Sequence, residues 1–485
     1  MFQQKIKEAT MGQWIKFSIV VFFVLLFFIW HGNPTILLSL ILFFDIYITR
    51  FIPWTWWKKA KNKTLRTVME WIDAILFALI AVYFINLYLF QNYKIPTSSL
   101  EKTLLVGDHL FVSKIAYGAR TPNTPFSFPL VQHTFPWGTK SYIEGIQWES
   151  RRLAGLRNVE RGDIVVFNFP AGDTVVSNMQ AVDYESICYG IGKKKLEQKN
   201  LNLDSLKSSS IDVRSLCLSI GQKIIKSNPQ QYGELLYRPV DRRENYVKRC
   251  VAIAGDTIEI RNREIFINGK KQDRPNGVQH YCEIVSKTTI TQDLLDQLSI
   301  SKEASEHSYM GQTEDGLHIY LIPLTESDQK YLSSLSTIVK VEEHNIEDLT
   351  SQRSAMYPMG YNLNWTTDNY GPIYLPKSGD TISLSLENLA LYERIIRNYE
   401  GNTLAVRNNE ILINNIPTKE YIVKQNYYWM MGDNRHNSAD SRMWGPVPED
   451  HIVGQPLFVW LSLNPDKNLF DGGIRWNRFF KGAKK

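Results

Sequence analysis

Hydrophobic residues follow two different patterns along this chain of 485 residues. The first ninety residues hold three long apolar runs, at about 14–30, 35–52 and 68–90. Each run is near the length of about 20 residues that a helix needs to cross a bilayer, and about 17 suffice. The His-Gly-Asn-Pro segment between the first two runs is typical of a turn. The pattern predicts a membrane anchor of three spans over residues 1–92.

The positions of the basic residues predict the orientation of this anchor. They lie before or at the start of the first run and fill the loop between the second and third, whereas the turn between the first two runs has none. Because basic loops favour the cytoplasmic side, the third run is expected to exit outward. Residues 93–485 would then lie outside the cytoplasm. The basic residues of the two segments are Lys5, Lys7, Lys16, Lys58, Lys59, Lys61, Lys63 and Arg66.

From residue 104 onward the apolar residues fall in short runs rich in β-branched and aromatic side chains, separated by Asn, Asp and Gly. Such runs are typical of β-strands. Residues 256–270 and 402–415 are expected to form hairpins with short asparagine-containing turns. The predicted fold is mainly β, an antiparallel curled-sheet domain over residues 93–485. Local helices are expected at residues 201–228 and 387–399.

Two regions interrupt the strand pattern and are expected to be insertions on a smaller β core. Residues 171–245 are polar and rich in lysine, and residues 280–375 mix short helical and irregular segments. The formal net charge of +6 is dispersed, with its basic clusters near the apolar runs. This distribution indicates attraction to lipid headgroups and not a nucleic-acid interface.

The four cysteines lack the spacing of a metal site, so no metal is expected. If their part of the chain lies outside the cytoplasm, a disulfide such as Cys188 to Cys217 is allowed but not required. Cys250 lies in an apolar strand-like run, where a small buried side chain is expected. The pairing of Cys282 stays open.

Three segments hold residues that could carry chemistry. The first follows the third apolar run, where Ile95 and Pro96 favour extended backbone before the hydroxyls of Thr97, Ser98 and Ser99. Taken alone, this segment could be a linker. The second is the strand-like segment 246–253, which contains Lys248. If this lysine is buried, its pKa falls below the ordinary value of about 10.4, and a neutral amine can take a proton from a serine. The alternative is a lysine that points to solvent.

The third segment is the loop at residues 431–448, which combines many residues of restricted geometry. Gly432 and Gly445 give backbone freedom, Asp440 and Arg442 can form a bidentate pair, and Ser438 is a small donor and acceptor. A solvated turn does not need this combination.

Together these segments resemble one family, the bacterial type I signal peptidases, which are membrane-bound serine proteases with a Ser-Lys dyad. The resemblance rests on IPTSSLEKTLLVGD (95–108), RGDIVVF (161–167), YVKRCVAIAGD (246–256) and MGDNRHNSADSRMWGPVP (431–448). It covers the β core and the membrane anchor but not the two insertions. It implies removal of signal peptides from exported preproteins at the outer face of the cytoplasmic membrane.

The resemblance also implies roles for individual residues. Ser99 would be the nucleophile and Lys248 the general base, with Thr97 as an oxyanion donor beside the Ser99 amide. Ser438 would hydrogen-bond the Lys248 amine. Asp440 and Arg442 would brace the loop, and Gly432 would let its backbone approach the site. No cofactor is implied. The implied partners are preprotein signal peptides, the lipid bilayer and the secretion machinery, and no nucleic acid.

Two alternatives remain open. Where many family members carry methionine and proline, this chain has Leu100 and Lys102, so that Ser99 and Lys102 form an S-x-x-K sequence typical of penicillin-binding proteins. That chemistry also needs a K-T-G strand, which the chain lacks, and a serine at a helix start, which Pro96 disfavours. The other alternative is a non-catalytic, membrane-anchored assembly protein whose insertions bind partners.

Overall fold

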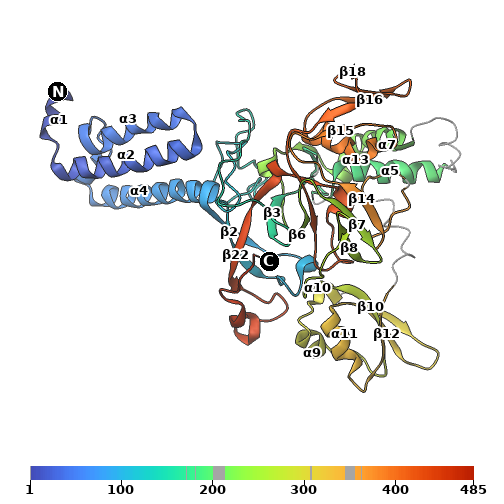
Figure 1. The fold of residues 1–485 in the computed structure, drawn as a ribbon. Helices are drawn as coiled ribbons and strands as arrows, with labels where there is room; N and C mark the ends of the chain where they lie inside the picture. The colour runs from blue at the N-terminus through green and yellow to red at the C-terminus, as the bar shows by residue number, and fades with distance from the viewer. Residues whose placement is uncertain are drawn as a thin grey trace.

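The computed structural model describes residues 2–170, 172–180, 182–199, 213–305, 308–344, 356–361 and 363–484. The N-terminal helices project as an arm from a body built mainly of β-strands (Figure 1). The chain returns near its end, where β22 (Ile452–Ser462) pairs with β2 (Asp108–Ser113). The predicted mainly β fold with an apolar helical arm is therefore observed.

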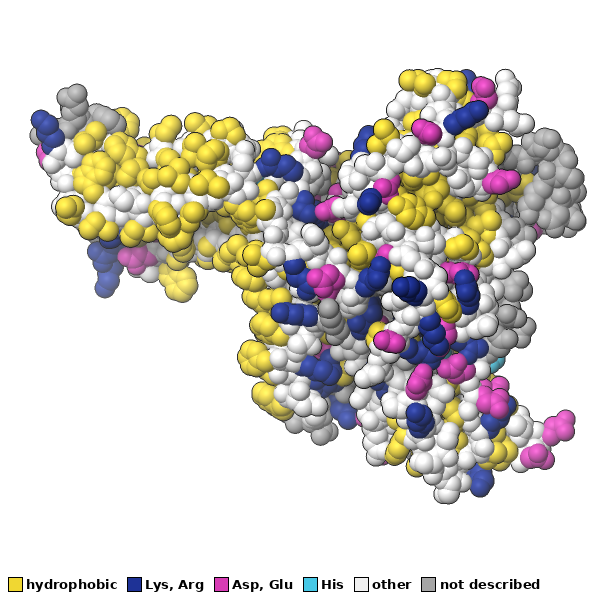
Figure 2. All heavy atoms as spheres, in the orientation of Figure 1, with side chains coloured by type: hydrophobic (Ala, Val, Ile, Leu, Met, Phe, Trp, Pro, Cys, Tyr) yellow, Lys and Arg dark blue, Asp and Glu magenta, His cyan; other side chains and the backbone are white. Residues whose placement is uncertain are grey.

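The arm contains two helices that are long and apolar enough to cross a membrane, α2 (Met11–His31) and α4 (Lys63–Phe84), which continues through η4 (Ile85–Leu89). Hydrophobic side chains cover much of the visible face of the arm (Figure 2). The middle apolar segment is shorter, Pro34–Thr49. It is built from η1 (Pro34–Leu38), α3 (Ser39–Phe44) and η2 (Asp45–Thr49), and the arm also has α1 (Phe2–Glu8) and η3 (Trp56–Lys59). Two of the three predicted spans have full length, and the three-span anchor stays a prediction.

The body is organised around a curled antiparallel sheet of seven strands in the order β1-β2-β22-β3-β6-β20-β21. Both faces of β3 (Ile164–Asn168) are buried, with Val165 and Phe167 in one core and Ile164 and Val166 in another. Burial on both faces explains why this strand is an unbroken apolar run. The remaining strands of the sheet are β1 (Phe90–Lys94), β6 (Asn245–Ala252), β20 (Tyr427–Met431) and β21 (Val447–Pro448).

Both predicted hairpins are confirmed. β7 (Thr257–Arg261) pairs with β8 (Glu264–Ile267), and β16 (Leu404–Arg407) pairs with β17 (Glu410–Ile413). Asn408 and Asn409 in the second turn both have positive φ, a conformation that asparagine tolerates. The short strands packed beside these hairpins are β9 (Lys270–Lys271), β14 (Tyr370–Tyr374), β15 (Thr381–Ser383), β18 (Ile416–Pro417) and β19 (Glu420–Ile422).

The first predicted insertion contains a helix pair, α5 (Tyr184–Gln198) and α7 (Val213–Ser227). Gly192 and Gly221 allow close packing, because a Cβ at either would lie 2.0 Å from a backbone oxygen of the other helix. The expected helix at 201–228 is observed from residue 213, whereas residues 201–212 lie outside the described residues, and α5 was not predicted. All four cysteines are buried free thiols. The region also holds β4 (Thr174–Val176), α8 (Pro229–Tyr232), β5 (Leu235–Tyr237) and η6 (Val240–Arg242).

The second predicted insertion is more ordered than its sequence suggested. Four strands form a separate sheet in the order β11-β12-β10-β13, which the prediction of short helical and irregular segments missed. Its elements are β10 (His280–Ser286), α9 (Gln292–Gln297), α10 (Lys302–Ser305), β11 (Tyr309–Gln312), β12 (His318–Leu324), α11 (Glu326–Ser333) and β13 (Ile338–Glu343).

The expected helix at 387–399 is confirmed as α13 (Leu389–Arg394) continued by η8 (Ile395–Tyr399). Short helical turns complete the fold. They are η5 (Ser98–Leu100), α14 (Ser441–Trp444), η9 (Glu449–His451), η10 (Leu469–Gly473) and η11 (Trp476–Arg478).

Candidate active site

Ser99 lies in a buried helical turn directly after the membrane arm and the first strand. The turn η5 follows Thr97, whose backbone is extended. Leu100 is 1% exposed and anchors the turn in the core that Ile95 and Leu104 share. Pro96 was expected to favour extended backbone and to disfavour a helix start at Ser99. The structure shows that the extended backbone ends at Thr97 and that Ser98–Leu100 form a short helical turn.

Lys248 lies in β6 and reaches the serine. Its Nζ is 2.5 Å from Ser99 Oγ, and the two residues are 3% and 8% exposed. Burial lowers the pKa of Lys248 to about 8, although the carboxylates of Asp440 and Asp433 act in the opposite direction. About one molecule in ten therefore has a neutral amine at pH 7. A buried, partly neutral amine in contact with a hydroxyl has the geometry of a general base beside a nucleophile.

The loop that follows β20 closes the site from the other side. The backbone N–H of Asn434 donates to the Ser99 carbonyl at 3.1 Å. Gly432 lies at the narrowest point, where an added Cβ would be 2.5 Å from that carbonyl oxygen and 2.3 Å from Ser438 Oγ. The close approach requires glycine at this position.

Two buried guanidinium–carboxylate pairs fix this loop. Arg442 donates to both carboxylate oxygens of Asp440 at 2.9 and 2.8 Å, which is the predicted bidentate arrangement. Asp440 also accepts from the Gly432 N–H at 3.2 Å. In the second pair, Arg249 donates to both oxygens of Asp433 at 2.7 Å. Charge-assisted bidentate bonds restrict geometry, so they hold the loop against the serine.

Two of the predicted supporting contacts differ from the expectation. Ser438 Oγ donates to the Ala439 carbonyl at 3.5 Å, and among the described residues it makes no hydrogen bond to the Lys248 amine. It instead lies against Gly432. Thr97 is exposed, and its hydroxyl forms no hydrogen bond within the described part of the chain. The Ser99 N–H likewise has no acceptor among the residues that the structure covers, as is common in the first turn of a helix.

The structure separates Lys102 from the serine. Its ammonium forms an ion pair with Asp328 at 3.0 Å and donates to the Leu298 carbonyl, both in the second insertion. The S-x-x-K arrangement of Ser99 and Lys102 is therefore not assembled. Nor do three His, Cys, Asp or Glu side chains gather as metal ligands within the described ranges.

Sequence reasoning missed the contacts that the second predicted insertion makes with the Ser99 turn. Glu303 accepts the Ser98 N–H at 2.9 Å, and Glu101 accepts the Ser301 N–H at 2.9 Å. The first pair is separated by 205 residues along the chain, so no local pattern signals it. Asp433 and Arg249 stand in motifs that the sequence singled out, but only the fold brings them together.

Known proteins are similar to this chain in sequence. The profile of a family described as "Signal peptidase, peptidase S26" matches residues 68–316 and 374–461, more than half of the chain. The chain belongs to the signal peptidase family S26. This signal peptidase is 23% identical over 430 residues to "Signal peptidase I" of Haemophilus influenzae, which covers 88% of the chain and 79% of the relative.

Two further relatives are also named "Signal peptidase I". The protein of Buchnera aphidicola subsp. Acyrthosiphon pisum is 23% identical over 425 residues, 87% of this chain and 83% of its own. The protein of Helicobacter pylori (strain ATCC 700392 / 26695) is 41% identical over 73 residues, 13% of this chain and 24% of its own. The predicted resemblance to bacterial type I signal peptidases is thus confirmed, and the signal peptidase is a protease by family.

Proposed function

We propose that this protein is a membrane-anchored serine endopeptidase that removes signal peptides from exported preproteins through an acyl-enzyme formed on Ser99. The observation that carries the proposal is the 2.5 Å contact between Ser99 Oγ and the Lys248 amine in a buried site. The family match and the names of the bacterial relatives support the choice of substrate.

The mechanism uses Lys248 first as a base and then as an acid. The neutral amine accepts the Ser99 hydroxyl proton while Oγ attacks the scissile carbonyl carbon. The resulting ammonium then protonates the leaving amine as the carbon–nitrogen bond breaks. In deacylation the amine takes a proton from a water molecule that attacks the ester carbon, and the ammonium then gives this proton to Ser99 Oγ as the carbon–Oγ bond breaks.

The oxyanion of each tetrahedral intermediate needs donors that are already in place. The Ser99 N–H is one, since it has no acceptor among the described residues, and the exposed Thr97 hydroxyl is the second. Asp440 and Arg442 hold the loop that carries Gly432 and Ser438. These roles remain proposals.

The edge of β6 offers a place for an extended substrate. β20 pairs with β6 from Arg249 to Ala252, whereas no described strand pairs with Val247 or Lys248 on that side of β6. An unpaired strand edge can bind a peptide in extended conformation through backbone hydrogen bonds. A signal peptide bound along this edge would pass directly beside Lys248.

Contacts within the arm support three membrane crossings. Lys5 Nζ donates to the Arg50 carbonyl at 3.0 Å, and Gln13 donates to the Tyr47 carbonyl at 3.0 Å. At the other end of α2, His31 contacts Tyr88 at 3.2 Å. The segment Pro34–Thr49 therefore runs back along α2, although sixteen helical residues reach only about 24 Å across a hydrocarbon core of about 30 Å. Local bilayer thinning accommodates such a mismatch.

With the basic loops in the cytoplasm, the β body would lie on the outer, periplasmic side of a bacterial cytoplasmic membrane. Residues 1–92 would be the anchor and residues 93–485 the catalytic domain, with insertions at about 171–245 and 280–375. The bilayer, signal peptides and the secretion machinery are the proposed partners.

A preprotein cleavage assay with purified full-length variants tests the proposal. Ser99→Ala and Lys248→Met should each lower kcat/KM by roughly 10³-fold or more, because nucleophile and base act as a unit. Lys102→Met, the matched lysine variant, should retain activity within about tenfold of the wild type, since its ion pair with Asp328 is only structural. Full activity in either of the first two variants, or none in the third, would reject the assignment.

A further inference from the structure

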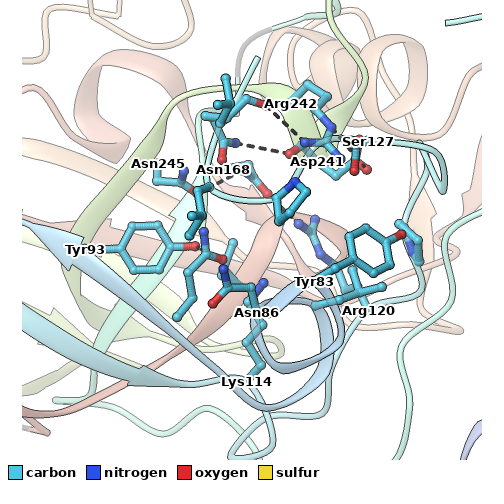
Figure 3. Close-up of a pocket in the computed structure, with 18 of the residues that line it drawn as sticks. Tyr83, Asn86, Tyr93, Lys114, Arg120, Ser127, Asn168, Asp241, Arg242 and Asn245 are labelled. Atoms are coloured by element: carbon cyan, nitrogen blue, oxygen red, sulfur yellow. Dashed lines mark hydrogen bonds and ion pairs between the residues drawn. The ribbon is translucent and has the colours of Figure 1, made fainter. Parts of the chain in front are cut away.

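A cavity of about 320 Å³, lined by both polar and apolar side chains, lies where the apolar helix α4 meets the β body, away from the Ser99 turn. Tyr83 and Asn86 line it from the end of the helix, and Tyr93 lines it from β1. Four cations line it: Lys94 at the end of β1, and three that Figure 3 labels, Lys114 just after β2, Arg120 in the loop that follows, and Arg242 in η6.

Positive charge exceeds negative charge in this cavity. The one carboxylate in its lining is that of Asp241, which accepts from the Thr124 N–H at 3.0 Å and the Thr124 hydroxyl at 2.9 Å. Of the five N–H groups of a guanidinium, Arg120 donates two within the described residues, to Asn168 and to the Asp450 carbonyl. Unused donors therefore remain.

Of the three cations that Figure 3 labels, Lys114 makes the fewest polar contacts through its side chain. Its ammonium forms no hydrogen bond or ion pair with any residue that the structure describes, and the side chain is partly open to the cavity. Burial, followed by repulsion from Arg120 and Arg242, lowers the pKa of Lys114 to about 7. An anion placed among these three groups would favour the charged amine and use the free donors.

An apolar groove continues from this cavity along the membrane helix. The two share Tyr83, Ser127, Phe128 and Pro129. Ile80 and Phe84 of α4 form one side of the groove, and Phe126 lies across from them, with 51%, 49% and 52% of these side chains exposed. A cationic pocket joined to an apolar groove matches an amphiphile with an anionic head and a hydrocarbon chain.

We propose that this composite site binds an anionic glycerophospholipid of the outer leaflet, with its phosphodiester among Lys114, Arg120 and Arg242 and one acyl chain along α4. The proposal rests on membrane insertion of α4, whose apolar stretch ends at this level. Basic pockets between transmembrane helices bind anionic lipid headgroups on the cytoplasmic side of membranes, and the same charge complementarity applies to this pocket. An acidic side chain of the substrate is the competing occupant, because Asn245 of the same cavity lies three residues from Lys248, about 10 Å along β6.

The groove favours lipid over a substrate carboxylate. A peptide side chain would use the cations but not a hydrocarbon channel that runs beside α4.

Native mass spectrometry of the full-length protein in detergent, titrated with dioleoylphosphatidylglycerol, measures lipid binding directly. Dioleoylphosphatidylcholine tests the role of net charge, and glycerol 1-phosphate tests the headgroup without chains.

Wild-type protein should hold one phosphatidylglycerol more tightly than phosphatidylcholine, and glycerol 1-phosphate at least tenfold more weakly. Lys114→Gln should weaken phosphatidylglycerol binding roughly tenfold or more, as expected for loss of a charge-assisted bond. Lys223→Gln, which removes an exposed lysine of α7, is the matched control and should bind as the wild type does.

A second measurement needs no variant. The Lys114 amine should react with an acetylating reagent near neutral pH, and phosphatidylglycerol should protect it. Equal lipid binding by Lys114→Gln and wild type, or no protection of Lys114, would overturn the proposal. So would a result in which Lys114→Gln leaves lipid binding unchanged but slows cleavage of preproteins with acidic residues before the cleavage site. Lipid binding is read without proteolysis, so a failure of the proposed cleavage function would be seen separately.

Discussion

At the scale of single residues, the site depends on close backbone contacts as much as on reactive side chains. Ser99 touches the Lys248 amine with its hydroxyl and the Asn434 amide with its carbonyl. The hydrogen bond from the Asn434 N–H to the Ser99 carbonyl fixes the orientation of Ser99, and so the direction in which its hydroxyl meets the Lys248 amine. Because Gly432 has no Cβ, its loop can lie close enough to Ser99 for both contacts to form.

Gly432→Ala tests this contact. The new methyl group would lie 2.5 Å from the Ser99 carbonyl oxygen, which is closer than real Cβ contacts, so the loop or the serine must move. We expect a fall in kcat/KM of roughly 10²-fold, since a displacement of about 1 Å has this effect in active sites. Cleavage kinetics measure it, with circular dichroism to verify folding.

Gly190→Ala is the matched control. Gly190 lies in α5 with nothing within 4 Å of an added Cβ, so alanine should leave activity unchanged. Wild-type activity in Gly432→Ala would show that the loop does not constrain Ser99.

Ser99 and Lys248 were predictable because each stands in a short motif with its own chemical logic. The bidentate pair of Asp440 and Arg442 was predictable for the same reason, since its members are two residues apart. The contact of Ser98 with Glu303 was not, because it depends on how a distant segment folds over the turn. The Ser438 expectation failed because a motif gives the residue but not its rotamer.

At the scale of elements, the second insertion is part of the support of the active site. Glu303 of α10 accepts the Ser98 N–H, while Lys102 just after the turn pairs with Asp328 of α11. The segment therefore contacts the Ser99 turn at both ends, through a hydrogen bond at Ser98 and a partly exposed ion pair at Lys102. Its sheet was missed because three helices, α9, α10 and α11, interrupt its strands along the chain.

Glu303→Ala removes one of these contacts. A hydrogen bond from an amide to a carboxylate contributes about 1.5–3 kcal/mol, so we expect kcat to fall by roughly tenfold or more while KM changes little. Steady-state kinetics on a preprotein separate the two constants. Glu314→Ala, on the exposed loop before β12, should behave as the wild type does. If both variants have equal kcat, the insertion does not position the serine.

The hairpins and the central sheet were easier to predict than the helix pair. Asparagines at positive φ mark the turn between β16 and β17, and the alternation of side chains marks the strands. In the sequence of α5, three consecutive lysines obscure the pattern of the apolar face that Cys188 and Leu196 form in the structure. Tertiary packing against α7, and not local pattern, makes this segment helical.

At the scale of the whole molecule, the helical arm packs directly against the β body. Tyr88 packs against Ala119 and Leu153 of the body, and Trp30 donates to the Ala154 carbonyl at 2.9 Å. The apolar helices of the arm are thus packed onto the β body close to the strand that leads to Ser99. If the arm spans a membrane, as we propose, this packing places the Ser99 turn near the bilayer surface.

Cysteine labelling tests the proposed orientation. The four native cysteines are buried, so wild-type protein should give little background with a membrane-impermeant maleimide. Glu314→Cys should be labelled in spheroplasts, whereas Lys61→Cys should be labelled only after the membrane is disrupted. Labelling of Lys61→Cys in intact spheroplasts would mean that the segment Pro34–Thr49 does not cross.

The claim that Lys248 acts as a neutral base is tested most directly by the pH dependence of kcat/KM for preprotein cleavage. The folded-state pKa of about 8 means that the neutral fraction, and hence the rate, rises with pH through that value. We predict a tenfold increase per pH unit below about 7 and a plateau above about 9. A rate that is constant between pH 6 and 9, or that levels off near pH 6, would contradict the account.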